Sequence, residues 1–475
     1  MSTFSGLSTA LSSLIAQRQA LEVSGQNIAN ANTVGYTRQR ADLTSVEALS
    51  APTLFSTGSG VGVGTQVSGI TRMGDMFLDA RLRSQTSSAT FQAAQATALS
   101  RLESTLTEPA DTGVAASLQT YWDGWQAVAN NPGDTAARTV LLGNADALTS
   151  QISSGYRAVE SQWNQLRTEA STLVTQVNTR SSAIADLNSQ IRSILVSGGS
   201  ANELIDQRSV MVTELSGLVG ATARQRDDGT LDVMVAGNAL VRGVRSEAIA
   251  VQGAATMAGG IGEPPVVLDP TRLVWADGGT PLTLEGGRVA SHIATLSPTG
   301  PLASAIGTWN SLATNLATSV NTLHQAGQNR AVPPVTGTDF FALAAGVPAA
   351  LGLSVAITDP ADVAAADPTK GALDGSWADQ ISQLATAAGG PDEQWQAFVV
   401  DLGVRTSAAT QRATVLEAAR STAENLQNSQ ASVDLDEESV NMLAYQRAYE
   451  GAARVLTAMD EMLDQLINRT GVVGR

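Results

Sequence analysis

The residue types that most often carry out chemistry are few and scattered in this sequence. His292 and His324 are far apart, and neither stands in an H-E-x-x-H pattern or beside a serine that could complete a catalytic triad. The chain contains no cysteine, which excludes thiol nucleophiles, disulfides and zinc–thiolate sites. No Gly-Lys pair occurs, so a Walker A phosphate-binding loop is excluded as well.

One group of carboxylates could still suggest an active site. Asp434, Asp436, Glu437 and Glu438 form the densest acidic cluster, and carboxylates are what a metal or acid–base site needs. The same four residues stand where a helix is expected to begin, with Asp436 at the N-cap and the glutamates at the positive end of the helix dipole. Capping therefore accounts for all four.

A glycine-rich stretch, Gly58 to Gly64, could suggest a phosphate cradle. Its spacing does not fit G-x-G-x-x-G, and residues 65–70 alternate as a strand does. We predict a strand bounded by glycines at this point. Taken with the absent motifs, this predicts a protein that is not an enzyme and has no cofactor or metal site.

Composition narrows the class of protein further. A net charge of -16 and a pI near 4.6 leave no basic patch for DNA or RNA. A length of 475 residues predicts two to four domains. The uncharged window Phe340–Ile357 contains Pro348 and Ser354 and is rich in Ala and Gly, which favours a partly buried loop and strand over a membrane span. The first 30 residues lack the pattern of a Sec signal peptide, so any export is expected to use an uncleaved N-terminus.

The elements around which the chain is organised are two apolar stripes, one near each end. Both repeat at steps of three and four residues, which predicts two helices of about 30 residues that pair with each other or with other subunits. The first stripe contains Phe4, Leu7, Leu11, Leu14, Leu21 and Ile28. The second contains Tyr445, Ala448, Ala452, Val455, Met459, Met462 and Leu466, and is widened by Tyr449, Leu456 and Leu463. Packing within one chain is the simpler explanation, but stripes at both termini favour a role in assembly.

Between these stripes, helical and strand patterns alternate in blocks. The sequence predicts helices over Met76–Leu106, Thr135 to about Val196 with a possible interruption near Gly155, Leu204–Leu218, Leu302–Ala326 and a block from Trp377 to Asn428. From Ala221 to about Ala290 the period changes to two, with a hairpin turn at Asp228-Gly229. Trp122 and Trp125 are expected to be core anchors.

The predicted fold is therefore mainly α with a β-rich insertion. It combines a terminal α-helical coiled coil, a middle bundle of long helices and an outer β domain. We expect three domains: residues 1–34 with 435–475 as the coiled coil, 35–220 with 300–330 and 372–434 as the helical bundle, and 221–299 with 331–371 as the β-rich outer domain.

The end of the first helix is followed by an unusual order of residues. Asn27, Asn30, Thr33, Gly35 and Tyr36 lie in a run that could be read simply as a helix terminus and turn. The run also resembles the N-terminal motif of the axial proteins of the bacterial flagellum, the rod, hook and hook-associated subunits. In that family an Asn-rich helix end precedes Thr-x-Gly-Tyr or Thr-x-Gly-Phe.

The resemblance covers nearly the whole chain and is greatest to the hook-associated subunits. It includes Trp125 with Asn131-Pro132, the segment Asn202–Leu215, Val320-Asn321 with His324, and Val433–Leu466. It implies a structural subunit at the junction between hook and filament that is required for filament assembly. The alternative is another axial subunit, either hook or distal rod protein. A secreted surface hydrolase would need a carboxylate pair or metal site that the sequence lacks.

The same resemblance implies a location and a set of partners. The protein is expected outside the cell in the flagellum, exported by the flagellar type III apparatus without a cleaved signal peptide. Its partners would be copies of itself, the hook protein, hook-associated protein 3, and a cytoplasmic export chaperone that holds roughly Val433 to Ile467. No nucleic acid partner and no membrane span are expected. Subunit and chaperone contacts are predicted for Leu7, Leu11, Leu14, Leu21, Ile28, Tyr445, Tyr449, Val455, Leu456, Met459, Met462, Leu463 and Leu466.

Overall fold

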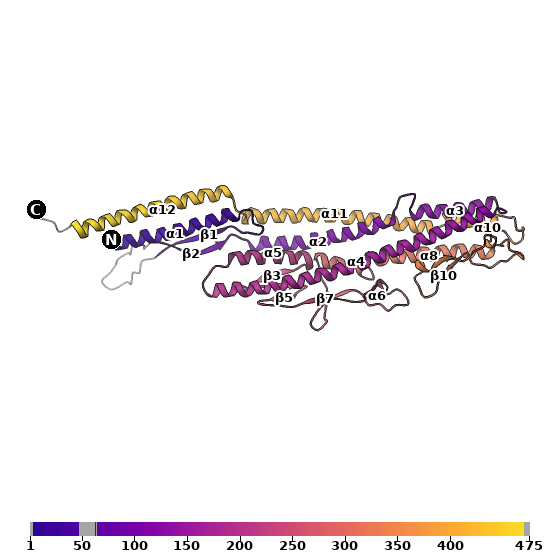
Figure 1. Ribbon diagram of the computed structural model, residues 1–475, viewed down its shortest axis with the longest axis horizontal. Helices are drawn as coiled ribbons and strands as arrows, with labels where there is room; N and C mark the ends of the chain where they lie inside the picture. The colour runs from indigo at the N-terminus through magenta and orange to yellow at the C-terminus, as the bar shows by residue number, and fades with distance from the viewer. Residues whose placement is uncertain (1–2, 47–61, 63, 470–475) are drawn as a thin grey trace.

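The protein is mainly helical, as the sequence predicts, and it is elongated (Figure 1). The computed structural model describes residues 3–46, 62 and 64–469. Both ends of the described chain lie at one end of the molecule, where α1 and α12 run beside each other (Figure 1). α4 runs through the rest of the body, and most of the strands lie along one of its sides (Figure 1).

The terminal part consists of two helices and a two-stranded sheet. α1 (Thr3–Asn30) and α12 (Leu435–Asp464) are antiparallel, since Gly6 faces Met459 and Ser24 lies near Asn441. β1 (Gln39–Ser45) and β2 (Thr65–Arg72) form an antiparallel sheet against α1. The glycine-bounded strand is confirmed from Thr65 onward, although 58–61 and 63 lie outside the described residues. Gly471, where the residue type predicts that the last helix ends, also lies outside them.

The helical body is held together by tryptophans. Trp122, Trp125, Trp163, Trp309 and Trp395 are all buried in one core cluster, which confirms the first two as core anchors. The helices that enclose this core are α2 (Met76–Leu106), α3 (Val114–Asn130), α4 (Thr135–Val196), α8 (Pro301–Ala326), α10 (Ser376–Ser382) and α11 (Pro391–Ala431), with the 3-10 turn η2 (Gln383–Thr386) between the last two.

The interruption expected near Gly155 is wrong. α4 continues for 62 residues without a break, and Gly155 has a packing role instead. A Cβ at this position would overlap the indole ring of Trp309, so glycine allows α8 to approach α4 closely. A glycine in a helical pattern can either interrupt the helix or allow another helix to approach closely. The sequence does not distinguish these two roles, but the structure does.

A second core lies under two small antiparallel sheets. The first sheet has the order β3-β4-β5-β6 and the second β7-β8-β9, and both pack with α4, α5 and α7. The elements are α5 (Asn202–Val219), β3 (Thr222–Gln225), β4 (Leu231–Val235), β5 (Asn238–Arg242), β6 (Arg245–Ser246), β7 (Ile249–Gln252), α6 (Met257–Ile261), β8 (Arg272–Trp275), β9 (Pro281–Leu282) and α7 (Gly287–Leu296). The predicted hairpin exists, but residues 226–230 connect its paired strands, so the connection is longer than a two-residue turn. Within it, the Asp228 carboxylate accepts hydrogen bonds from the Thr230 amide and hydroxyl.

Two segments differ from what the sequence suggested: one in its secondary structure, the other in the core to which it belongs. Gly286 and Gly287 introduce the amphipathic helix α7, not another strand, and α7 buries Val289 and Leu296. Residues 331–371 pack into the tryptophan core through Phe340, Phe341 and Leu353, whereas the sheets belong to the second core. This segment contains β10 (Phe341–Leu343), α9 (Ala349–Gly352), β11 (Leu353–Val355) and η1 (Pro360–Asp362).

The uncharged window Phe340–Ile357 contains two short strands and a turn of helix, where the sequence predicts a partly buried loop and strand. Within the described residues, no helix is both long and apolar enough to cross a membrane. At the other end of the chain, the carboxylate that caps α12 belongs to Asp434, not Asp436: it accepts from the amides of Asp436 and Glu437. α12 ends in a short π-helical turn, η3 (Gln465–Arg469).

His324 links α8 to two loops. It is fully buried, its Nε2 accepts a hydrogen bond of 2.8 Å from the Ala364 amide, and its Nδ1 lies 2.7 Å from the Thr338 carbonyl oxygen. Nε2 can accept only if it carries no proton, so the neutral ring is protonated at Nδ1 and donates to Thr338. Burial lowers the pKa of His324 from its ordinary value, as burial also does for His292.

We predict that Gly155→Ala lowers the free energy of unfolding by about 1–3 kcal/mol, because the Trp309 ring must move to make room. Gly143→Ala is the matched control on the same helix, since nothing lies within 4 Å of a Cβ at that position. This control should gain up to about 1 kcal/mol from helix propensity. Urea unfolding of both variants measures the difference, and equal effects would contradict the close contact.

We predict that the melting temperature falls as the pH drops below about 6.5. The folded state holds His324 neutral, so the unfolded chain binds more protons in this range and gains stability relative to the folded chain. Melting curves at several pH values test this for the wild type and for His324→Gln. The variant should melt lower at neutral pH and show a weaker pH dependence. Burial lowers the pKa of His292 as well, so His292→Gln should also weaken the pH dependence. An unchanged pH dependence in His324→Gln would contradict the assignment.

Candidate assembly interface

α12 has more apolar surface than α1 can cover. Tyr445 packs against the cluster formed by Ala20, Val23 and Ala41, and Ala452 is buried. On the flanks of the same helix, large apolar side chains remain in contact with solvent. Val455 is 48% exposed, Met462 45% and Leu466 54%. A helix with apolar residues around most of its circumference needs further partners.

The structure places the predicted contact residues in two groups. Those that are partly covered are Leu7, Leu14, Leu21, Ile28, Tyr445, Leu456, Met459 and Leu463. Those that are exposed are Leu11, Tyr449, Val455, Met462 and Leu466. The stripes read from the sequence therefore combine the α1–α12 contact with an outer surface.

The most buried positions of α1 are not the leucines of the predicted stripe. The most buried apolar ones are Ala10, Ala16, Ala20 and Val23, and the polar Ser24 and Asn27 are buried with them. Alanine is often fully buried, and the spacing of Ala16, Ala20 and Val23 places these three on one side of α1. Sequence reasoning followed the larger side chains and missed this face, as well as the exposed Ile15 and Ile467. The alanine spacing was the available signal.

Asn27 explains the first position of the motif after α1. Its side chain is 1% exposed and binds the main chain of β1: Nδ2 donates to the Gln39 carbonyl at 2.8 Å, and Oδ1 accepts from the Gln39 amide at 3.0 Å. The Tyr36 hydroxyl also donates to Oδ1, at 2.9 Å. Asn27 thus replaces a neighbouring strand at this edge of the sheet.

The other motif residues shape the turn that brings β1 back to α1. Gly35 has a φ of +79°, which favours glycine, and its Cα faces Val210 of α5. Thr33 donates to the side chain of Asn30 at 3.2 Å. Burial, with the negative charges of Glu203, Asp206 and Glu438, raises the pKa of Tyr36 to about 12, so its hydroxyl stays a donor.

α5 fixes the same segment from the other side. The Asp206 carboxylate accepts from the Thr37 amide at 2.9 Å and forms an ion pair with Arg72 at the end of β2. Asn202 Nδ2 donates to the Gln39 side chain and to the Ile70 carbonyl, both at 3.0 Å. The base of the two-stranded sheet is therefore attached to the body by buried polar contacts. The resemblance pointed to this segment of α5, but nothing in the sequence identified its partners.

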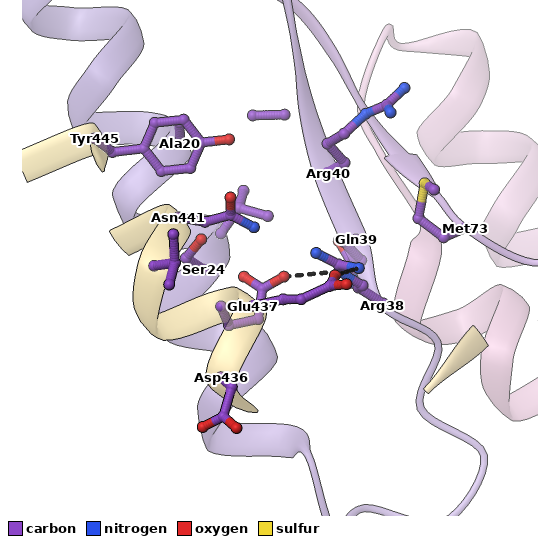
Figure 2. Close-up of a pocket in the computed structure, with 14 residues that line it drawn as sticks. Ala20, Ser24, Arg38, Gln39, Arg40, Met73, Asp436, Glu437, Asn441 and Tyr445 are labelled. Atoms are coloured by element: carbon purple, nitrogen blue, oxygen red, sulfur yellow. Dashed lines mark hydrogen bonds and ion pairs between the residues drawn. The ribbon is translucent and has the colours of Figure 1, made fainter. Parts of the chain in front are cut away.

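Arg38 connects this sheet to α12. Its Nε lies 2.7 Å from Glu438, and one of its terminal nitrogens lies 2.7 Å from Glu437 (Figure 2). Its main-chain amide donates to the Ala431 carbonyl at 2.8 Å. Glu438 is almost fully buried. The acidic cluster therefore caps a helix and binds an arginine. Within the described residues, no group of three or more His, Cys, Asp or Glu side chains could hold a metal ion.

We call the paired contacts of Arg38 with Glu437 and Glu438 the Arg38 fork. A groove of about 570 Å³ lies beside it. Ala20, Val23 and Ser24 of α1 line it together with the β1 segment around Ala41 and the α12 side chains of Val440, Asn441 and Tyr445 (Figure 2). Its surface is mainly apolar, with Arg38, Asp436 and the two glutamates at one end. Arg40 also lines it and pairs with Asp42 at 3.1 Å. Such an arrangement suits the binding of another protein surface.

A family model, that of the helical domain of the flagellar hook-associated protein FlgK, matches residues 99–341, more than half of the chain. The chain belongs to the FlgK family of flagellar hook-associated proteins. Two further models match its ends: the flagellar basal body rod protein at residues 7–37, and the C-terminal part of the basal body rod proteins FlgEFG at residues 428–469. The first match covers most of α1 and ends just before Arg38, and the second covers α12 with Glu437 and Glu438.

Relatives of the FlgK family extend over the whole chain. The flagellar hook-associated protein 1 of Bacillus subtilis is 28% identical over 514 residues and covers 100% of both chains. That of Escherichia coli is 29% identical over 405 residues, which span 80% of this chain and 68% of the relative. The solved structure of the flagellar hook junction protein FlgK from Burkholderia pseudomallei has a TM-score of 0.63 at 17% identity, over 75% of this chain and 100% of that one, which shows a shared fold.

We predict that Asn27→Ala lowers the stability of the terminal part by about 1–3 kcal/mol, because it leaves the buried amide and carbonyl of Gln39 without partners. Hydrogen exchange of the Gln39 amide should become faster. Asn32→Ala, at an exposed asparagine of the same turn, is the matched control and should leave exchange unchanged. Equal exchange rates in the two variants would show that Asn27 does not hold β1.

Proposed function

We propose that this chain is a structural subunit of the flagellum that joins hook to filament and is required for filament assembly. One observation carries the proposal. The two ends of the chain, which match models of flagellar rod proteins, pair as α1 and α12, and this pair is attached to a body that matches the FlgK helical domain. The names of the relatives support it, since they are hook-associated proteins. The match over residues 99–341 favours this role over that of a hook or distal rod protein.

The proposed division of labour follows the architecture. Residues 1–34 with 435–475 would form the assembly domain, and the helical bundle would add contacts between copies. The sheets of 221–299 would face outward. The support is that the exposed apolar residues of α12 lie on its flanks, beside the contact with α1. Contiguous exposed apolar surface of this kind marks a site of interaction with another protein.

We infer the partners from the same surface and from the family. Copies of the chain, the hook protein and hook-associated protein 3 would cover α12 after assembly. Before export by the flagellar type III apparatus, a cytoplasmic chaperone would hold residues 433–467, which keeps Val455, Met462 and Leu466 out of water. The protein would then act outside the cell. Its role is structural, without catalysis.

Deletion of the gene tests the proposal directly. We expect cells with complete hooks and no filaments, and unpolymerised filament protein in the medium, seen by electron microscopy and by immunoblotting. The wild-type gene on a plasmid should restore filaments. Cells without hooks would point to a hook or rod protein, and normal filaments after deletion would refute the proposal.

A point variant tests the α12 surface. Val455→Asp places a charge on the exposed apolar flank and should abolish filament formation while the melting temperature stays close to that of the wild type. Thr457→Asp makes the same change at an exposed polar position two residues away and is the matched control. Filament counts by electron microscopy compare the two. Normal filaments in Val455→Asp would exclude this flank from assembly.

A further inference from the structure

The groove between α12 and β1 matches the chemistry of one exposed face elsewhere in the molecule. We propose that the face of α2 that carries Phe77 and Arg81 docks into this groove on a second copy of the chain. The proposal rests on the proposed function, since it identifies a contact through which copies join. One surface offers a projecting aromatic ring and a neighbouring cation, and the other offers an apolar recess and an anion.

The projecting part is the first turn of α2. Phe77 is 83% exposed, although a phenylalanine is normally among the more buried residues. Arg81 lies one turn later, so its side chain leaves the helix on the same face. Asp79 and Leu82 are buried and face the body instead. Arg81 is exposed and forms no ion pair with any described residue.

The receiving part is the groove described above. Its floor is made of the small apolar residues Ala20, Val23 and Ala41, and Val440 stands at its side. A volume of about 570 Å³ lies within the range of pockets that enclose whole ligands, about 300–1,000 Å³. The groove therefore has room for an aromatic ring and the aliphatic part of an arginine.

The charge at the edge of the groove is opposite to that of Arg81. Asp436 lines the groove and is exposed, and within the described residues its carboxylate pairs with no cation. Figure 2 shows this carboxylate pointing away from Arg38, which is occupied by the two glutamates. The complementary charges would fix the orientation of docking. They also give a local attraction between copies of a chain whose net charge of -16 is repulsive.

The two parts lie at the same level of the elongated molecule. Met73 lines the groove and precedes Phe77 by only four residues. Two copies that stand side by side at one level could thus bring the aromatic ring of one to the groove of the next. This contact is heterologous, and its repetition produces a ring or a helical layer of copies.

Crosslinking tests the contact in assembled flagella. The chain has no native cysteine, so the double variant Phe77→Cys/Val440→Cys carries only the two introduced thiols. Mild oxidation should produce a ladder of covalent oligomers from this variant and none from either single variant. The absence of a ladder in cells that form filaments would overturn the proposal. A dimer without higher oligomers would overturn the head-to-tail arrangement.

A charge exchange tests the orientation. Arg81→Glu and Asp436→Arg should each reduce the number of filaments, and the double variant Arg81→Glu/Asp436→Arg should restore them. Arg412→Glu, at an exposed arginine of α11, is the matched control with the same change of net charge and should have no effect. Melting temperatures verify that every variant folds. A double variant no better than the worse single variant would overturn the pairing.

The outcome separates this inference from the proposed function. If deletion of the gene leaves filaments intact, the proposed function fails. If the wild-type gene restores filaments but the cysteine pair gives no ladder and the charge exchange gives no rescue, the function stands and only the docking contact is wrong.

Discussion

The structure depends on the hydrogen bonds that the outer edge of β1 makes at the place where α1 and α12 join the body. A two-stranded sheet leaves main-chain groups without partners on its outer edges. At Gln39 both groups are taken by the Asn27 side chain, which the Tyr36 hydroxyl holds in place. Because these bonds require one relative position of helix and strand, they fix the register of α1 against the sheet.

These polar contacts around Asn27, Arg38 and Asp206, here called the polar node, are connected to the β-rich part by hydrogen bonds from α5. Asp206 and Asn202 hold the sheet of the terminal part, and Arg208, on the same helix, donates to Asn188 at 2.7 Å. Asn188 in turn binds the main chain of Leu231 at the start of β4. Polar groups buried in such a chain of contacts are costly to disturb singly. A single helix therefore fixes both the terminal part and the sheets to the body.

Periodicity and composition predicted the parts of the fold that are local. The bounds of Met76–Leu106 and the burial of Trp122 follow from apolar spacing and side-chain size. The ion pair of Arg72 with Asp206 joins residues 134 positions apart, and no local pattern encodes such a partner. The sequence suggests a break at Gly155 because it does not show the Trp309 ring that this glycine accommodates. Spacing predicted the pairing of the two terminal helices, but the buried apolar positions of α1 are mainly alanines, which large apolar side chains in the pattern do not reveal.

In the terminal part, polar contacts and apolar contacts have different roles. Inside one copy, specificity comes from the polar node at Asn27, Arg38 and Asp206, while α1 contributes mainly small side chains to the apolar contact. The larger side chains, such as Val455 and Met462, stay on the flanks of α12. If neighbouring copies cover these flanks, as proposed, the buried apolar area adds stability without changing the polar contacts, because these are already satisfied. The polar contacts thus fix the geometry of the single chain, and the exposed apolar side chains stay available for contacts with other proteins.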